Sequence, residues 1–272
     1  MLPDLEQVRR IVIDVANSLL PQRFAVAQKN IKPDGSIVTD ADFMMQRHIT
    51  LALEKKWPTI PLVGEETAEV ERDAKLSEHN DGLWCLDPVD GTSNFSAGIP
   101  FFAVSLALLI HRKPVLGVVY DPMRDEFFAA IKDQGAWLNG VRLSSQPLDL
   151  PLNKGIGNID FKRLSPSLAA KLAQQPPYSS QRSFGSVALD WCWLAANRYH
   201  VYLHGKQKVW DYAAGCLILS EAGGRSSTLE GEPVFTPEMQ PRSAVAALDP
   251  TLYDEWMRWL NIAIKENTCF RL

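Results

Sequence analysis

Residues 83–94 of the 272-residue chain read Leu83-Trp84-Cys85-Leu86-Asp87-Pro88-Val89-Asp90-Gly91-Thr92-Ser93-Asn94. The first four residues are apolar and predict a short buried strand. This strand leads directly into a turn that carries Asp87 and Asp90, at the strand end where α/β folds place their ligands. Pro88 stiffens such a turn, and Gly91 lets backbone approach a ligand closely. The stretch therefore predicts an α/β fold with two carboxylates at the end of one strand.

The residue types in this turn suit a hard cation and an anion together. Asp87 and Asp90 offer the oxygen ligands that Mg²⁺ prefers. Thr92 and Ser93 fit the start of a following helix, whose exposed backbone N–H groups favour a phosphate. Read alone, however, the pattern Asp-Pro-x-Asp-Gly is as typical of an ordinary surface turn as of a metal site.

Two further segments add carboxylates. The apolar run 60–63 predicts a strand that brings Glu65 beside Asp87. Asp211 stands in the first turn of a predicted helix that starts at Val209 and stops at the glycines 223–224; alone, it would be read as a cap or a dipole partner. Four carboxylates without a lysine or arginine in the same motifs would raise one another's pKa if buried together. Divalent cations would remove that repulsion.

Four motifs occur in an order that resembles the inositol monophosphatase family. They are Val38–Asp42, Gly64–Glu66, Asp87–Phe95 and Trp210–Gly224, so the resemblance covers most of the chain. It implies a layered αβαβα sandwich of α+β and α/β character, of the inositol monophosphatase/fructose-1,6-bisphosphatase type. It also implies a Mg²⁺-dependent, lithium-sensitive phosphomonoesterase that works as a homodimer.

The resemblance also implies roles for particular residues. Two or three Mg²⁺ ions would be held by Glu65, Asp87, Asp90, Asp211, the Val89 carbonyl and the Thr92 hydroxyl. Asp42 would pair with Thr92 to orient and deprotonate a metal-bound water for in-line attack on phosphorus, while a second ion stabilises the leaving alkoxide. The implied substrate-binding positions are Gly91, Thr92, Ser93, Gly185, Ser186, Val187, His204, Lys208 and Asp211.

The substrate side departs from the best-known relatives. These carry a glutamate seven residues before the final metal aspartate, and here that position is His204. It opens the basic run His-Gly-Lys-Gln-Lys at 204–208, which either favours a substrate with extra negative charge or is a solvated loop. Inositol monophosphate or a similar polyol or sugar phosphate is the leading interpretation. The alternatives are 3′-phosphoadenosine 5′-phosphate, fructose 1,6-bisphosphate and histidinol phosphate.

Two hypotheses belong to other classes of function. The first is a regulatory or scaffold protein of the same fold, since some bacterial relatives work with the transcription machinery. Such a protein would be catalytically inactive, and the presence of all four carboxylates, Glu65, Asp87, Asp90 and Asp211, argues against that. The second is a module that binds an anion without hydrolysing it, and the presence of both Asp42 and Thr92 argues against that.

Composition limits the partners. The net charge is −4 and the basic residues are scattered, so a nucleic-acid polymer is not an expected partner. The longest apolar stretch, Phe101–Ile110, is too short to span a bilayer, and the first residues lack a signal-peptide layout. We expect a cytoplasmic protein whose partner is a small phosphorylated substrate. The four cysteines have no paired spacing, which indicates reduced thiols.

The pattern along the chain predicts two halves, residues 1–147 and 148–272. Helices are expected at 5–20 and 42–57, an antiparallel meander at 101–110, 115–120, 126–131 and 135–138, and a final strand and helix at 244–247 and 250–265. The active site would lie between the halves. The polar segments 29–37 and 67–81 are expected to be mobile loops near it.

Overall fold

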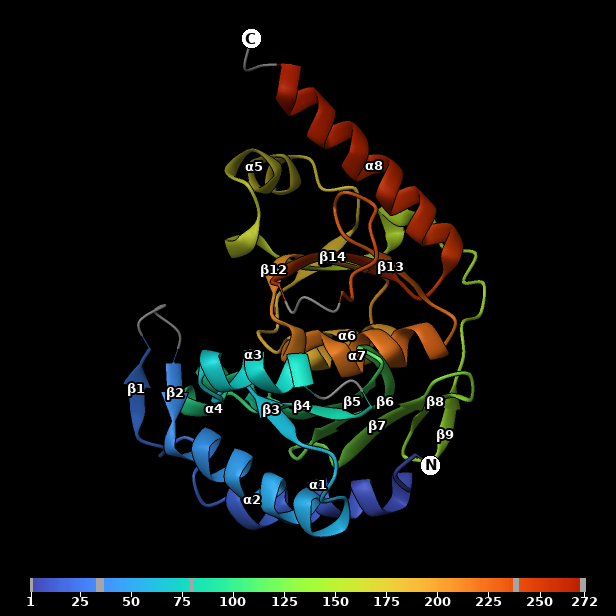
Figure 1. Ribbon diagram of the computed structural model, residues 1–272. Coiled ribbons are helices and arrows are strands. Elements are labelled where there is room, and N and C mark those ends of the chain that lie inside the picture. The colour runs from blue at the N-terminus through green and yellow to red at the C-terminus, as the bar shows by residue number, and fades with distance from the viewer. Residues whose placement is uncertain (1, 33–36, 79–80, 237–239, 270–272) are drawn as a thin grey trace.

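The computed structural model describes residues 2–32, 37–78, 81–236 and 240–269. Figure 1 shows five layers that alternate between helices and sheets, with the N-terminal helices at the bottom and the C-terminal helix at the top. Three clusters of buried apolar side chains fill the spaces between these layers. The αβαβα sandwich implied by the sequence is therefore confirmed.

The larger sheet is built mostly from consecutive strands. Within the described residues it has seven strands in the order β3-β4-β5-β6-β7-β8-β9. Their bounds are β3 Leu62–Gly64, β4 Leu83–Asp90, β5 Ala103–Ile110, β6 Lys113–Asp121, β7 Glu126–Ile131, β8 Gly135–Leu138 and β9 Val141–Leu143. β3 runs parallel to β4, and each later pair is antiparallel.

Strand β4 is buried along its whole length because both faces of this sheet are covered. Trp84 and Leu86 pack toward helices α1 (Leu5–Leu19) and α2 (Asp40–Lys56). Leu83 and Cys85 point the other way, toward the central helices. Burial on two faces explains why the sequence here is a continuous apolar run and does not alternate.

The smaller sheet has five strands in the order β11-β10-β12-β14-β13 within the described residues. The strands are β10 Ile156–Asp160, β11 Ser180–Arg182, β12 Val201–Gln207, β13 Arg225–Ser227 and β14 Arg242–Ala247. β10 pairs in parallel with β11 and β12, whereas β14 is antiparallel to both of its neighbours. Helices α5 (Pro166–Gln174) and α8 (Pro250–Cys269) cover its outer face (Figure 1).

Helices α6 (Val187–Ala195) and α7 (Val209–Glu221) lie between the two sheets. Most of their side chains are buried, as expected for helices that are apolar on nearly every side. Their N-termini lie near the end of β4. This central layer therefore brings residues of the C-terminal part of the chain to the two aspartates of β4.

The remaining described elements are short. They are β1 Lys29–Ile31 and β2 Ile37–Thr39, which form a hairpin, α3 Glu69–Glu78, α4 Thr92–Ala97 and the 3₁₀ turns η1 Leu152–Lys154 and η2 Phe161–Arg163. The expectation of loops at 29–37 and 67–81 is thus wrong for 29–31 and 37, which lie in strands, and for 69–78, which form a helix. Residues 33–36 and 79–80 of these two segments lie outside the described part. The other expected helices and the antiparallel meander are confirmed, with ends shifted by a few residues.

In the described parts of the chain, no helix is both long and apolar enough to cross a membrane. The larger sheet ends at Leu143 and the smaller one begins at Ile156. We therefore keep residue 147 as a proposed boundary between the two halves.

Candidate metal centre

Asp87 and Asp90 lie within strand β4, not in a turn after it as the sequence predicted. The antiparallel register with β5 is interrupted between them, so the strand bulges there before it ends at Asp90. Such a bulge re-aims side chains that simple alternation would separate. The turn follows at Gly91, whose φ is +90° and where an added Cβ would lie 3.1 Å from the Phe101 carbonyl oxygen. Glycine is required there for both reasons.

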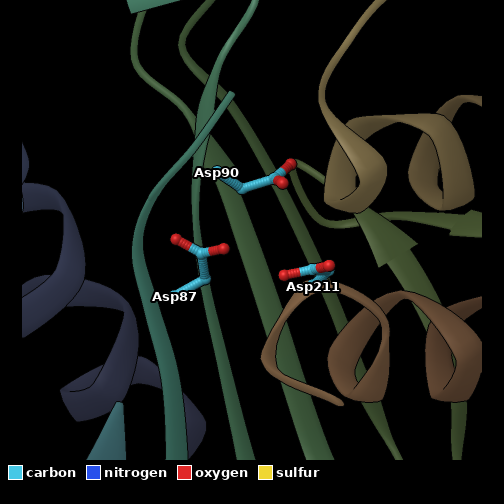
Figure 2. A group of neighbouring side chains, drawn as sticks. All are labelled: Asp87, Asp90 and Asp211. Carbon is cyan, nitrogen blue, oxygen red and sulfur yellow. The ribbon is translucent and has the colours of Figure 1, made fainter. Parts of the chain in front are cut away.

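Asp211 completes a group of three carboxylates. It lies in the first turn of α7, and its carboxylate faces those of Asp87 and Asp90 across the gap between helix and strand (Figure 2). One oxygen from each of the three residues lies within 4.8 Å of the other two. Asp211 also caps the start of α7, because the Lys208 backbone N–H donates to Asp211 Oδ2 over 2.8 Å. One carboxylate oxygen therefore fixes the helix start, and the other is available to the group.

Burial and mutual repulsion make these carboxylates unfavourable as anions. Burial raises the pKa of Asp87 well above its ordinary value, and the charges of Glu65, Asp90 and Asp211 raise it further. Burial and the charges of Asp90 and Glu65 also raise the pKa of Asp211. A divalent cation among the three would stabilise their ionised forms, so the residues present fit a hard metal ion.

Asp90 differs from the other two in having two donors on one oxygen, whereas Asp87 accepts one bond from the Val89 N–H and Asp211 accepts one from the Lys208 N–H. The Ser186 hydroxyl and the Ala188 backbone N–H, the latter over 2.8 Å, both donate to Asp90 Oδ2. Burial raises its pKa to about 6, and these hydrogen bonds limit the rise. The Val187 backbone N–H also bonds to this carboxylate. The start of α6 thus orients one candidate metal ligand.

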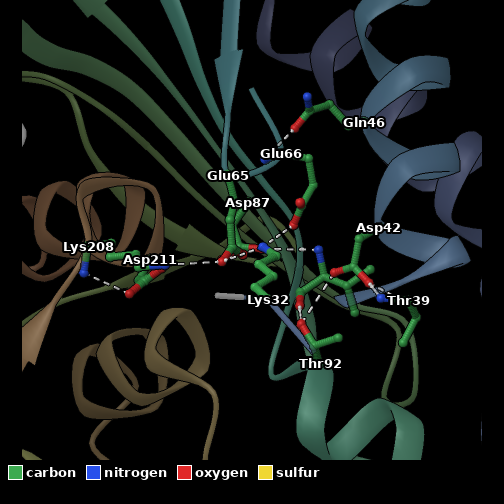
Figure 3. Close-up of polar contacts among 11 residues, drawn as sticks. Lys32, Thr39, Asp42, Gln46, Glu65, Glu66, Asp87, Thr92, Lys208 and Asp211 are labelled. Atoms are coloured by element: carbon green, nitrogen blue, oxygen red, sulfur yellow. Dashed lines mark hydrogen bonds and ion pairs between the residues drawn. The ribbon is translucent and has the colours of Figure 1, made fainter. Parts of the chain in front are cut away.

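Asp42 and Thr92 meet beside this group (Figure 3). Asp42 Oδ2 accepts hydrogen bonds from the Thr39 backbone N–H over 2.8 Å and from the Thr39 hydroxyl over 2.6 Å. Asp42 Oδ1 lies 3.3 Å from Thr92 Oγ1, which donates to the Val89 carbonyl oxygen over 2.9 Å. Burial raises the pKa of Asp42 to about 6, although the bonds from Thr39 oppose the rise.

Glu65 approaches the same region from the end of β3 and is held by two lysines. Lys32 Nζ lies 2.5 Å from Glu66 and 3.2 Å from Glu65, and Lys208 Nζ lies 3.5 Å from Glu65 (Figure 3). Burial opposes the charge of Lys32, but the two glutamates raise its pKa above the ordinary value. Sequence reasoning placed Lys32 in a mobile segment and missed this contact.

A cavity of about 380 Å³ opens over these residues. Most of the positions singled out in the sequence line it: Glu65, Asp87, Val89, Asp90, Gly91, Thr92, Ser93, Gly185, Val187, His204, Lys208 and Asp211. Asp42 and Ser186 do not; they lie behind it, in contact with Thr92 and Asp90. The cavity is also lined by Lys162, Arg163 and Lys206. Of these, only Lys206 stood out in the sequence, as part of the basic run.

His204 lines the cavity, but both of its ring nitrogens are occupied by the protein. Nδ1 accepts the Lys206 backbone N–H over 3.1 Å, so Nε2 carries the proton that is donated to Asp160 Oδ2 over 2.9 Å. The side chain is 7% exposed. His204 therefore holds two backbone segments together and offers no ring nitrogen to a ligand in this arrangement.

The three described cysteine side chains do not belong to the site. Cys85 and Cys192 are buried and Cys216 is half-buried, and burial raises the pKa of each thiol, that of Cys216 to about 11. Their thiolates are disfavoured, so they are packing residues.

The layered fold and its buried acidic group define the class, a phosphatase fold with a candidate metal centre between the two sheets. The chain belongs to the inositol monophosphatase family, which it matches over residues 3–264. Members of this family are generally Mg²⁺-dependent phosphatases.

Curated relatives carry two kinds of name. "Nus factor SuhB" of Haemophilus influenzae is 37% identical over 191 residues, which cover 69% of this chain and 70% of that protein. "Inositol monophosphatase 1" of Solanum lycopersicum is 36% identical over 197 residues, with 69% and 70% covered.

Solved structures agree with the family assignment. The inositol monophosphatase of Thermotoga maritima superposes with a TM-score of 0.83 at 27% identity, over 96% of this chain and 98% of that one. A SuhB protein of Bartonella henselae gives 0.81 at 28% identity, over 94% and 97%.

Proposed function

We propose that the protein is a Mg²⁺-dependent phosphomonoesterase that hydrolyses inositol monophosphate or a similar polyol or sugar phosphate. The observation that carries this proposal is the group of buried Asp87 and Asp90 with half-buried Asp211, in which one oxygen from each residue lies within 4.8 Å of the other two in the wall of a cavity. Family membership supports phosphatase activity in general.

Glu65, Asp87, Asp90 and Asp211, with the Val89 carbonyl and the Thr92 hydroxyl, are the proposed ligands for two or three Mg²⁺ ions. Bound Mg²⁺ would neutralise the phosphate oxygens and lower the pKa of a coordinated water. Asp87 and Asp90 are buried, and hydrogen bonds already orient Asp87, Asp90 and Asp211, so little reorganisation is needed when the ions bind.

Asp42 and Thr92 are the proposed catalytic pair. The Thr39 bonds fix Asp42 Oδ2, which leaves Oδ1 facing the Thr92 hydroxyl. In this position Asp42 can accept the proton that Thr92 takes from an attacking water, provided that it is ionised. The backbone of 91–93 and of 185–187 flanks the cavity and is proposed to hold the phosphate and the alcohol.

The leading substrate assignment rests on a relative named inositol monophosphatase at 36% identity. Fructose 1,6-bisphosphate, 3′-phosphoadenosine 5′-phosphate and histidinol phosphate remain alternatives. Inhibition by Li⁺ and a homodimeric assembly are proposed on the same resemblance. Both are checked directly, by activity with added LiCl and by light scattering after size exclusion.

A second candidate function is regulatory, because several relatives are named Nus factor SuhB. The chain would then keep the fold and the acidic site while acting through a protein or nucleic-acid partner. This candidate and the phosphatase differ in one prediction, since only the phosphatase requires the carboxylates for its activity.

The test is phosphate release with and without Mg²⁺ from inositol 1-phosphate, fructose 1,6-bisphosphate, 3′-phosphoadenosine 5′-phosphate, histidinol phosphate and 2′-AMP. The variant Asp87→Asn should lose Mg²⁺-dependent release, and the exposed Asp14→Asn is the matched control. Release from none of these compounds would overturn the proposal and favour the regulatory candidate. Full activity of Asp87→Asn would instead overturn the assignment of Asp87 as a metal ligand.

A further inference from the structure

The mouth of the cavity carries a group of basic side chains that the acidic floor does not use. They are Lys162, Arg163 and Lys206, and we call them the basic rim. Lys162, Arg163 and Lys206 are exposed. Within the described residues, these three side chains have no hydrogen-bond or ion-pair partner. Lys208, in contrast, reaches toward Glu65 at the floor.

The protein builds the rim from two segments that are far apart in sequence. Lys162 and Arg163 lie in η2, directly after β10, and Lys206 lies in the bulged end of β12. Asp160 and His204 are register partners on these adjacent parallel strands, and their side chains form the 2.9 Å contact described above. This contact ties the two cationic segments together at one edge of the cavity.

Gly205 allows the segments to come even closer. A Cβ at this position would lie 1.8 Å from the Arg163 carbonyl oxygen, so only glycine fits against the η2 backbone. The carboxylate of Asp160 beneath the rim is already engaged, by His204 and by the Lys162 backbone N–H over 2.9 Å. The cationic side chains at the mouth are therefore carried by backbone segments that pack against each other, and not by a solvated loop.

The charges of the floor and the rim call for different ligands. The floor carries the carboxylates that are proposed to bind Mg²⁺, and the phosphate to be hydrolysed would bind there. The rim cations lie on the same cavity, where the alcohol part of the substrate would extend. Lysine and arginine are the side chains that recognise phosphate groups, as point charges and as planar donors respectively.

Resting on the proposed phosphomonoesterase activity, but favouring the doubly phosphorylated alternatives over inositol monophosphate, we infer that the preferred substrate is a phosphomonoester whose alcohol carries a second phosphate, which the basic rim binds. The shared chemistry is that second phosphate, on either a sugar or a nucleoside. The hydrolysed ester would lie at the acidic floor, and the product would keep the rim-bound phosphate.

The experiment compares pairs of compounds that differ by the second phosphate alone. The sugar arm uses fructose 1,6-bisphosphate and fructose 1-phosphate, and the nucleotide arm uses 3′-phosphoadenosine 5′-phosphate and 3′-AMP. We expect kcat/KM to be at least about tenfold higher for the doubly phosphorylated member of one pair, mainly through KM, and the difference to shrink with added NaCl.

The variant Lys162→Ala/Lys206→Ala removes one cation from each segment. It should lower the ratio of the two kcat/KM values about tenfold. The matched control, Lys113→Ala/Lys132→Ala, changes the net charge equally at exposed positions outside the cavity and should keep the wild-type ratio. The inference would be overturned if the two kcat/KM values of a pair were nearly equal for the wild type in both arms. It would also be overturned if the rim variant lost kcat/KM equally for both members of a pair.

Failure of the inference and failure of the proposed function give different results. Mg²⁺-dependent hydrolysis with no preference within either pair overturns the rim inference alone. If no compound is hydrolysed, the phosphatase proposal fails, and calorimetric binding of the same pairs with Mg²⁺ still tests the rim. Tighter binding of the doubly phosphorylated member, lost in the rim variant, would support it; equal affinities would overturn it.

Discussion

The substitution Asp90→Asn should stabilise the metal-free protein while removing its response to Mg²⁺. In the folded protein the pKa of Asp90 is raised from 3.8 to about 6. Because the folded-state pKa lies above the unfolded one, this group favours folding at low pH, and that contribution is lost as pH rises through about 6. At about pH 8 the ionised carboxylate costs the folded state about 3 kcal/mol relative to a neutral group.

The amide can replace the carboxylate with little rearrangement. Ser186 and Ala188 both donate to Oδ2, and an asparagine oxygen at the same place can accept both bonds. The amide nitrogen would then take the place of Oδ1. It is a hydrogen-bond donor and cannot bind a metal ion.

The assay is thermal unfolding in EDTA and in Mg²⁺, with phosphate release measured in parallel. In EDTA at about pH 8 we expect Asp90→Asn to gain up to about 3 kcal/mol, or roughly 5–10 °C in Tm, and the gain to shrink toward pH 4. Added Mg²⁺ should raise the Tm of the wild type and of the control Asp14→Asn, but not that of the variant. A variant that is less stable than the wild type in EDTA at about pH 8, or that hydrolyses substrate at a near-normal rate, would refute the reasoning.

Three further outcomes follow from the same contacts. The metal-free wild type should have a higher Tm near pH 5 than near pH 8, because the pKa of Asp42 is also raised, from 3.8 to about 6. Mg²⁺ should reduce this difference in Tm. A Tm that rises with pH in EDTA would contradict the prediction. Ser186→Ala removes a charge-assisted bond to Asp90 and should weaken Mg²⁺ binding about tenfold in calorimetry without unfolding the protein. Unchanged Mg²⁺ affinity would show that the hydroxyl does not matter. Gly205→Ala must displace the Arg163 backbone, so it should lower the free energy of unfolding by about 1–3 kcal/mol. It should also reduce the preference for doubly phosphorylated substrates. A variant with wild-type stability and preference would contradict the close approach of Gly205 to the Arg163 carbonyl.

Much of the arrangement was predictable from the sequence because local signals agreed with one another. The apolar run before Asp87 predicted β4, since burial on both faces leaves no polar alternation in a strand. The structure brings Asp211 to the end of that strand, as the motif order implied. The bulge between Asp87 and Asp90 was missed because it depends on pairing with β5.

Other features depend on contacts that no local pattern reveals. Helix α3 was expected as a loop because its composition is polar. It is held by the Lys75–Glu71 pair and by Lys75 Nζ, which donates to the Leu62 carbonyl oxygen over 3.0 Å. Lys162 and Arg163 looked like any solvated basic pair. Only the register of β10 against β12 places them beside Lys206.

The two ends of the cavity come from different sheets, and this division affects how such a protein can change over generations. On the assignment proposed above, the carboxylates of the floor belong to the larger sheet and to α7, whereas residues 161–163 and 205–206 belong to the edge of the smaller sheet. A duplicated gene could alter that edge and accept a different alcohol while the floor stays intact. Substrate range could then diverge through a series of active intermediates, none of which loses the hydrolytic step.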